Sequence, residues 1–505
     1  MRAAVGLAAA LALAVALWRL DASTAPLAVA RDRAGAVPVT VFQPRAGERA
    51  PVVVVAHGFA GSQQLMQPFA VTLARNGYVA VTFDFPGHGA NPEPLPGGLA
   101  DRAARSAALQ RALEAVVAYA RALPASDGRV ALLGHSMAAD VVVRYAQAYP
   151  EVAATVAVSP FLAGGVTRDS PRNLLVLVGA LEPRGLIDAG RAAVGASDAG
   201  EVAPGTTAGR FADGTARRLA LARGAEHIGV LYSRDSLTES VEWLNQAFAR
   251  RSAGFADARG PWLALLYAGL LGLAWALARA LPQVAPAPRG AALRGRRLAV
   301  VAIAPAVLTP LVLWPLPTGW LPLLLGDYLA LHFALYGLLT ASALWLVGRA
   351  SPRAPVPPTR RAALAVATGA ASAYLLLGFG LPTDAYLAAF WPPPERLPLA
   401  AAMLAGTLPY FLADEWVTRG AGAPPLAYAL TKLCFLASLA AAIALNLAEL
   451  FFLAIIVPAI LAFFVVFGLA SGWIYRRTLH PLPGAAANAL VFAWAIAATF
   501  PIVQR

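Results

Sequence analysis

Ser136 is the first candidate for covalent chemistry, because it lies in the pentapeptide 134–138 (GHSMA) between an expected strand and an expected helix. A serine on such a sharp strand-to-helix turn is exposed above the edge of the sheet, where its hydroxyl group can attack a carbonyl carbon. The motif reads G-x-S-x-A, with Ala138 in place of the more usual second glycine. The alternative is that Ser136 is only the N-cap of the helix, a position at which serine is common.

His227 is the candidate general base for this serine. A base must lie beside the nucleophile, while a carboxylate holds the imidazole in the correct tautomer. His227 lies in the segment 224–227 (GAEH) after the last expected strand, and it is the only histidine of residues 1–260 that follows Ser136. The other three are His57 and His88, which precede the serine, and His135, which flanks it and cannot easily fold back onto it.

Glu182 is the candidate carboxylate, because it follows the expected strand 173–178 in the segment GALEP. A carboxylate at that strand end would face the histidine loop, and the chain order serine, glutamate, histidine is typical of this kind of nucleophile turn. Glu226 adjoins the histidine and would have to double back, whereas Asp213 lies in the glycine-rich stretch 188–216, which we interpret as a loop or a hairpin insertion. The rival carboxylates are therefore Asp188, Asp213 and Glu226.

The loop 57–62 (HGFAGS) directly follows the valine-rich strand 51–56 and is the candidate oxyanion loop. Its glycines allow backbone N–H groups to approach a ligand closely, and we predict that the amide of Phe59 donates a hydrogen bond to the oxyanion. The amide of Met137, directly after the nucleophile, is the expected second donor. We expect His57 to be a hydrogen-bonded structural histidine. An ordinary strand-to-helix turn is the alternative for the whole loop.

Short runs rich in β-branched residues alternate with helical stretches over the first 250 residues. This alternation predicts βαβ units and a parallel sheet that helices cover on both faces. The fold class is therefore α/β, and the three candidate side chains should meet at the rim of the sheet. The expected strands are 51–56, 78–83, 129–133, 152–158, 173–178 and 217–222, and the expected helices are 64–76, 101–123, 137–149 and 236–250.

The first half of the chain resembles the α/β-hydrolase superfamily, near its esterase, lipase and serine-aminopeptidase-like branch. The resemblance covers about residues 38–250 and rests on the segments HGFAGS, DFPGHG, GHSMA, GALEP and GAEH. It implies that the DFPGHG loop, with Asp84 and His88, borders the mouth of the active site. This sequence departs from the commoner pattern at the alanine that ends GHSMA and at Glu182, where aspartate is more usual. The segment 159–172, where many members insert a helical cap, is short here.

These residues predict the transfer of an acyl group to water. Ser136 would attack an ester, thioester or amide carbonyl, His227 would take and return the proton, and Glu182 would orient the imidazole. An acyltransferase with the same residues would differ only in the acceptor that its pocket admits. The expected substrate is a small-molecule or lipid-like acyl compound. We expect no metal and no organic cofactor, because no nucleotide-binding glycine loop and no ligand cluster is visible.

The composition excludes a purely soluble protein. Hydrophobic residues make up 59% of the chain and charged residues only 13%, against about 25% charged in soluble domains. Residues 21–260 hold 23 basic and 21 acidic side chains, whereas residues 261–505 hold 15 basic and 6 acidic side chains.

The net charge of +13 does not indicate a nucleic-acid partner, because the basic residues lie in short loops between apolar runs. The single cysteine, Cys434, excludes an intrachain disulfide and a cysteine-based zinc site.

Apolar runs long enough to cross a bilayer fill residues 261–505, so we expect a multi-pass domain of about eight helices in contact with membrane lipids. The runs are 261–280, 298–316, 320–347, 363–381, 397–413, 426–446, 448–470 and 484–502. Every second connecting loop is basic. These loops contain Arg289, Arg294, Arg296 and Arg297, then Arg349, Arg353, Arg360 and Arg361, then Arg419, and finally Arg476 and Arg477. The positive-inside rule makes those loops cytoplasmic and the domain at 38–250 extracytoplasmic.

Residues 3–18 form a further apolar run, either a membrane anchor or a signal peptide. A small-x-small motif exists at 28–30 (AVA), but it lies beyond Arg19 and Asp21. Signal peptides are cleaved close to the apolar region, so we expect residues 1–20 to be retained as an anchor. The chain has one lysine and 39 arginines, a bias that favours GC-rich coding and therefore a bacterial source. We expect the protein to lie in the bacterial inner membrane.

Two other functions stay open on the sequence alone. The membrane half could be a transporter-like or lipid-handling protein with an accessory hydrolase-fold domain, or the hydrolase fold could serve only for binding. Ionisable residues inside the apolar runs favour the first of these, unless they are simply paired polar groups inside the bundle. They are Asp327, His332, Asp414, Glu415 and Glu449. The complete set of serine, histidine and carboxylate argues against a domain that only binds.

Overall fold

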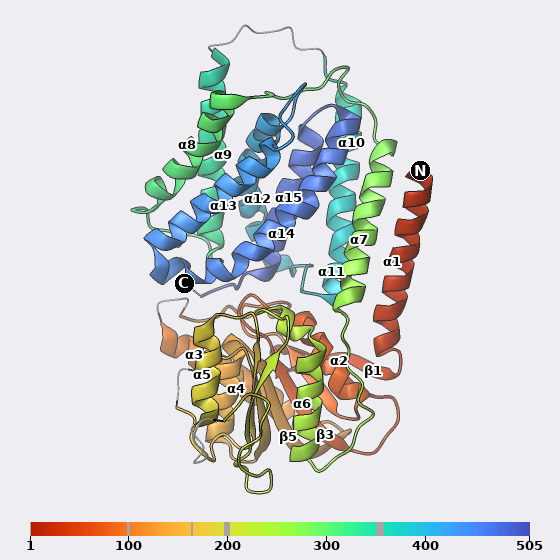
Figure 1. The fold of residues 1–505 in the computed structure, drawn as a ribbon, viewed down its shortest axis with the longest axis vertical. Coiled ribbons are helices and arrows are strands. Elements are labelled where there is room, and N and C mark those ends of the chain that lie inside the picture. Colours follow the sequence, from red (N-terminus) through yellow and green to blue (C-terminus); the bar gives the residue numbers. More distant parts are fainter. Residues whose placement is uncertain (1, 98–100, 163–164, 196–201, 350–357, 505) are drawn as a thin grey trace. The chain divides into compact units, whose positions relative to one another are not determined.

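The computed structural model describes residues 2–97, 101–162, 165–195, 202–349 and 358–504 (Figure 1). The chain divides into two compact units. The sheet unit consists of residues 14–266, 383–389 and 501–505, and the helical unit consists of residues 1–13, 267–382 and 390–500.

A mixed eight-stranded sheet forms the centre of the sheet unit, with the order β1-β2-β4-β3-β5-β6-β7-β8. Strands β3 to β8 pair in parallel, whereas β2 pairs antiparallel with both β1 and β4. The prediction of a mostly parallel sheet is confirmed, and β3 and β4 are buried along their whole length, as in sheets covered on both faces. The strands are β1 (Leu27–Ala34), β2 (Val37–Pro44), β3 (Ala50–Ala56), β4 (Val79–Phe83), β5 (Ser126–His135), β6 (Val152–Val158), β7 (Leu174–Gly179) and β8 (Arg217–Ala222).

Helices cover both faces of this sheet (Figure 1). On one face, α2 (Gln67–Arg75) and α6 (Arg234–Ala247) pack together over a core that includes Phe69, Leu133 and Leu244. On the other face, α4 (Met137–Ala148) and α5 (Arg184–Gly195) enclose a second core, and α3 (Arg102–Ala122) packs beside α4. The carboxyl ends of the parallel strands are thereby held on a rigid base.

Strands β1 and β2 and helix α5 do not follow from the sequence patterns above. Strand β1 is an edge strand with exposed charged side chains at 31–33, so it shows no continuous apolar run. The interpretation of 188–216 as a loop or a hairpin is wrong over its first residues, because α5 extends to Gly195. Leu186 and Val194 form the apolar stripe of this helix and pack in the core with Leu219. The glycine and charged residues between them concealed the helical spacing.

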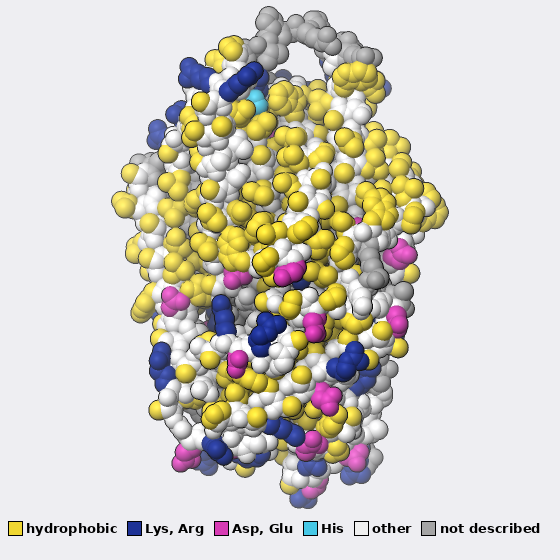
Figure 2. All heavy atoms as spheres, turned by 180° about the vertical axis from the view of Figure 1, so that it is seen from behind, with side chains coloured by type: hydrophobic (Ala, Val, Ile, Leu, Met, Phe, Trp, Pro, Cys, Tyr) yellow, Lys and Arg dark blue, Asp and Glu magenta, His cyan; other side chains and the backbone are white. Residues whose placement is uncertain are grey.

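Nine helical segments among the described residues are long and apolar enough to cross a membrane. The outer surface of the helical unit consists mainly of hydrophobic side chains (Figure 2), which favours contact with lipid rather than water. A transmembrane helical bundle therefore follows the sheet unit in the sequence. The helices are α1 (Arg2–Thr24), α7 (Gly260–Leu277) with η3 (Ala278–Ala280), α8 (Gly295–Leu313), α9 (Gly326–Arg349), α10 (Arg361–Ala373) with η4 (Tyr374–Gly378) and α11 (Phe379–Tyr386), η5 (Pro394–Arg396) with α12 (Leu397–Thr418), α13 (Ala427–Leu445), α14 (Leu447–Thr478) and α15 (Leu482–Thr499).

Ionisable side chains inside the bundle are paired. Lys432 on α13 forms a buried ion pair with Asp414 on α12. Glu415 Oε2 lies 2.7 Å from Arg419 Nε, one turn further along α12. His332 on α9 lies within hydrogen-bonding distance of a serine hydroxyl on α13. The contacts of Lys432 and His332 join α13 to α12 and α9, as expected of polar groups paired inside the bundle, which was the alternative to a transport role.

Exposed arginines lie in three of the four loops expected to be basic, whereas Arg419, the basic residue of the fourth, pairs with Glu415. Arg294 and Arg296 are exposed, whereas Arg396, in a loop expected to be poor in basic residues, is fully buried. Arg396 donates hydrogen bonds to the carbonyls of Ala497 and Phe500, at 3.0 and 2.7 Å, and so caps the end of α15. Its charge therefore does not count as a loop charge. Residues 350–357, with Arg353, and the side chain of Arg349 lie outside the described residues.

Candidate active site

Strand β5 ends in a strained turn that carries Ser136. This residue has φ 54° and ψ −115°, a region that residues other than glycine rarely adopt. The turn requires a small residue at Gly134, where a Cβ atom would lie 2.4 Å from the carbonyl oxygen of Ala138. The side chain of Ser136 makes no capping hydrogen bond to α4. The alternative of a simple N-cap therefore does not describe this serine.

The imidazole of His227 lies between Ser136 and Glu182. Its Nε2 atom is 3.0 Å from Ser136 Oγ, and its Nδ1 atom is 2.8 Å from Glu182 Oε2. An ionised carboxylate can only accept a hydrogen bond, so Nδ1 carries the proton and Nε2 offers its lone pair to the serine hydroxyl. The loops after β7 and β8 supply the carboxylate and the imidazole, at the same edge of the sheet where β5 ends. A histidine in this position can accept the hydroxyl proton.

The carboxylate of Glu182 is held by two further hydrogen bonds. Its Oε1 atom accepts from Ser159 Oγ at 2.5 Å and from the amide of Gly179 at 2.8 Å. Burial alone would raise the pKa of Glu182, but the hydrogen bonds from His227, Ser159 and Gly179 outweigh it and leave the pKa below its ordinary value. Sequence reasoning missed Ser159. Its only signal is a polar residue directly after a buried strand, which is too common to be diagnostic.

The three rival carboxylates have other partners. Asp188 and Asp213 form exposed ion pairs with neighbouring arginines. Glu226 accepts hydrogen bonds from two backbone amides of the turn that follows it, at 2.9 and 2.6 Å. Glu226 therefore stabilises the turn that carries His227, while the contact with the imidazole is made by Glu182.

His135 supports the loop of His227, a role that sequence reasoning missed. Its Nε2 atom lies 3.0 Å from the carbonyl oxygen of His227, and the two rings are 5.0 Å apart. A carbonyl only accepts, so Nε2 carries the proton. Burial, together with the neighbouring imidazole, lowers the pKa of His135 to about 3. His135 is therefore a neutral donor that positions the backbone of His227.

The two predicted oxyanion donors lie on segments that border the serine. Met137 is the first residue of α4, and the first amides of a helix have no acceptor within the helix. The loop that holds Phe59 packs against the nucleophile turn, because a Cβ atom on Gly58 would lie 3.0 Å from Ser136 Cβ. The amide of Ser136 itself donates to the carbonyl of Val158 at 2.8 Å. It is therefore already engaged and is not a third donor.

His57 and Asp84 connect the loops that follow β3 and β4. His57 Nδ1 lies 2.8 Å from the carbonyl oxygen of Gly58, and Nε2 accepts from the amide of Phe85 at 3.1 Å. Burial lowers the pKa of His57, although the nearby Asp84 partly offsets this. Asp84 accepts hydrogen bonds from the amide and the side chain of Gln63. His57 is therefore structural, as expected, and Asp84 is fully buried rather than exposed at a mouth.

The C-terminal segment of the chain pairs with the loop after β4. The amide of Ile502 donates to the carbonyl of Gly87 at 2.9 Å, and the amide of Leu95 donates to the carbonyl of Ile502 at 2.8 Å. Gly87 has φ +77°, and a Cβ atom there would lie 2.3 Å from the carbonyl oxygen of Ile502. The next residue, His88, contacts the ring of Phe59 with centroids 6.3 Å apart. The last residues therefore brace the candidate oxyanion loop.

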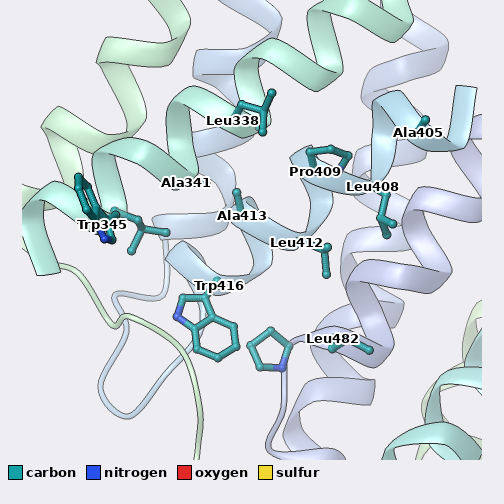
Figure 3. A pocket seen from close by; sticks show the side chains of 13 residues that line it. Leu338, Ala341, Trp345, Ala405, Leu408, Pro409, Leu412, Ala413, Trp416 and Leu482 are labelled. Carbon is teal, nitrogen blue, oxygen red and sulfur yellow. The ribbon is translucent and has the colours of Figure 1, made fainter. Parts of the chain in front are cut away.

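An apolar groove of about 710 Å³ lies in the helical unit, along α9, α12 and the start of α15 (Figure 3). Its lining, which includes Leu338, Trp345 and Trp416, has no charged side chain and no hydroxyl group. Such a surface can hold a hydrocarbon chain but offers no group for catalysis.

Within the described ranges, no three histidine, cysteine or carboxylate side chains are grouped so as to hold a metal ion.

Residues 47–201 match the family model described as serine aminopeptidase, S33. A search of curated proteins found no match. Among solved structures, a predicted CIB-like hydrolase from Thermoplasma acidophilum is similar, with 14% identity and a TM-score of 0.33 over 44% of this chain and 99% of that chain. A hypothetical protein from Pseudomonas aeruginosa has 14% identity and a TM-score of 0.31 over 41% of this chain and 89% of that chain. The matched segment contains Ser136 and Glu182, and the sheet unit has the α/β-hydrolase fold.

Proposed function

We propose that this hydrolase-fold protein is a membrane-anchored serine hydrolase that cleaves ester-type acyl bonds, with thioesters and amides as related substrates. The observation that carries the proposal is the continuous set of hydrogen bonds from Ser136 through His227 to Glu182. This geometry suits proton transfer from a nucleophilic hydroxyl group, with the resulting imidazolium stabilised by a buried carboxylate.

In the proposed mechanism, Ser136 Oγ attacks the substrate carbonyl while His227 Nε2 takes the hydroxyl proton. The amides of Phe59 and Met137 donate hydrogen bonds to the developing oxyanion. His227 then gives the proton to the leaving group, and an acyl-enzyme ester on Ser136 results. Water attacks this ester with His227 again as the base, which releases the acid and restores the serine. No step requires a cofactor.

The sheet unit is proposed to lie on the extracytoplasmic side, anchored by α1. Exposed arginines in alternate loops of the helical unit support this orientation. The small-x-small motif at 28–30 lies within β1, which pairs with β2 over its whole length. Cleavage there would cut an edge strand of the sheet, which supports the retention of α1. A cysteine placed at the exposed Arg210 should react with an impermeant maleimide in intact cells, and one placed at Arg296 should not.

Hydrolysis of a p-nitrophenyl ester by the full-length protein in detergent tests the activity. The Ser136→Ala variant should lose at least about 10⁴-fold in kcat, because the serine and histidine act as one unit. Equal turnover by this variant and the wild-type protein would exclude the proposed mechanism.

A further inference from the structure

Three arginines converge on one hollow at an end of the helical unit. The hollow has a volume of about 370 Å³ and is lined by Trp275, Ala278, Arg279, Trp473, Arg476 and Arg477. Arg279 lies in η3, directly after α7, and Arg476 and Arg477 lie in the last turn of α14. All six residues belong to the helical unit, so the hollow is formed within that unit alone.

No carboxylate pairs with these arginines in the part of the chain that the structure describes. Arg477 Nε donates to the carbonyls of Arg279 and Leu281, at 3.1 and 2.8 Å, which fixes the stem of its side chain. Among the described residues, no acceptor contacts its terminal nitrogens or the guanidinium groups of Arg279 and Arg476, and all three side chains are exposed. Elsewhere in this unit, the partly buried Arg419 and the buried Lys432 are each paired with a carboxylate.

The ends of the helices explain only part of this arrangement. A cation in the last turn of a helix is stabilised by the helix dipole, so each arginine is favourable by itself. Three positive charges around one hollow repel one another, however, and a bound anion would remove that repulsion. The planar guanidinium group matches the oxygens of a phosphate in pairs. The hollow is also within the size range of small-molecule sites.

We propose that this hollow binds a phosphate-bearing anion, specifically the headgroup of an anionic phospholipid. Trp275 and Trp473 line the same hollow, and tryptophan is typical of the depth at which phospholipid headgroups lie. Basic pockets at the ends of transmembrane helices are suited to anionic headgroups. The apolar outer surface of the neighbouring helices places acyl chains beside the hollow. A soluble phosphate compound offers the same oxygens without the acyl chains.

The test measures ligand binding by the full-length protein with native mass spectrometry and thermal unfolding. The ligands are phosphatidylglycerol, zwitterionic phosphatidylcholine and inorganic phosphate, each used alone. The test variant combines Arg279→Gln, Arg476→Gln and Arg477→Gln. The matched control combines Arg296→Gln, Arg360→Gln and Arg361→Gln, which removes the same charge from exposed arginines outside the hollow. A third variant, Arg476→Lys, keeps the charge but loses the planar fork.

The wild-type protein and the control should retain phosphatidylglycerol, and the test variant should bind it at least about tenfold more weakly. Arg476→Lys should give an intermediate affinity, which a variant that merely misfolded would not show. Stabilisation by millimolar inorganic phosphate without lipid retention would assign the site to a soluble phosphate instead of a lipid. Equal losses in the test and control variants, or equal binding of phosphatidylcholine, would overturn the proposal. In phosphatidylcholine, the test variant should unfold at the same temperature as the wild-type protein. This control shows that the three substitutions leave the fold intact.

Discussion

His227 Nε2 lies 3.0 Å from Ser136 Oγ, although the two residues are 91 positions apart in the sequence. This contact joins the loops at the ends of β5 and β8, which two other strands separate in the sheet. The loop after β8 is held in place by the hydrogen bond from His135 to the carbonyl of His227. The distance is therefore set by the scaffold, as the proposed catalytic role of the pair requires.

Glu182→Gln should reduce kcat by about 10³- to 10⁴-fold, because an amide cannot stabilise the imidazolium and favours the wrong tautomer. The KM should change little, since the carboxylate contacts His227 rather than the substrate. The matched control is Asp188→Asn, an exposed carboxylate that pairs with Arg191 and not with the imidazole. It should retain kcat within a few fold. Similar losses in the two variants would mean that Glu182 has no specific role.

Acid should destabilise the sheet unit through His135. Its pKa is about 3 in the folded protein and about 6.5 in an unfolded chain, so between these values only the unfolded chain binds the proton. The contribution of neutral His135 to the free energy of unfolding is therefore fully present above about pH 6.5. This contribution, roughly 3–5 kcal/mol, is lost as the pH falls toward 3. His135→Gln keeps a donor for the carbonyl of His227 but cannot titrate.

Pulse proteolysis in urea at pH 4 to 7 measures this effect on the full-length protein. The wild-type stability should fall with acid more steeply than that of His135→Gln. A residual slope is expected from His57, whose pKa is also lowered by burial. Identical slopes for the two proteins would contradict the assignment of His135 as a buried neutral group.

Exposed apolar side chains flank residues of the candidate site in the sequence, from which we predict a preference for long acyl chains. Phe161, Leu181 and Ile228 are 53%, 67% and 39% exposed, and each lies within two residues of Ser159, Glu182 or His227. Burial of each additional methylene group against such side chains contributes up to about 0.8 kcal/mol. The ratio of kcat/KM for dodecanoyl over acetyl esters should therefore be at least about tenfold.

Replacement of Phe161, Leu181 and Ile228 by serine should reduce that ratio toward one, with the esters kept below their micelle concentrations. The matched control is Val29→Ser, another exposed apolar position, on the far edge strand β1. It should leave the ratio unchanged. An acetyl ester that is hydrolysed as fast as the dodecanoyl ester by the wild-type protein would refute the preference.

Ile502→Pro should loosen the loop after β4, because proline has no amide hydrogen to donate to the carbonyl of Gly87. Faster hydrogen exchange is expected at Leu95, whose amide donates to residue 502. Activity should fall as well, since this loop supports the segment of Phe59. Gln504→Ala keeps its backbone amide and serves as the control. Unchanged exchange at Leu95 in the proline variant would show that the C-terminal segment does not hold the loop.

The sequence predicted those parts that depend on rare residue types or long patterns. The continuous valine run of β3 indicates a buried strand, and elimination among four histidines leads to His227. Strand β1 was not predicted, because an exposed edge strand has little hydrophobic signal. Ser159 and His135 were not identified either. Their roles depend on contacts between strands and loops that are distant in the sequence, and a single serine or histidine carries no sign of such contacts.

Labelling with a fluorophosphonate tests directly whether Ser136 is a nucleophile, because this probe reacts preferentially with an activated serine. The full-length protein in detergent is treated with the probe, and the modified residue is identified by peptide mass spectrometry. We predict modification at Ser136 in the wild-type protein, strongly reduced modification in His227→Ala, and none in Ser136→Ala. A folded wild-type protein that stays unlabelled, or one labelled equally after loss of His227, would contradict the proposed catalytic role of the contact between these two residues.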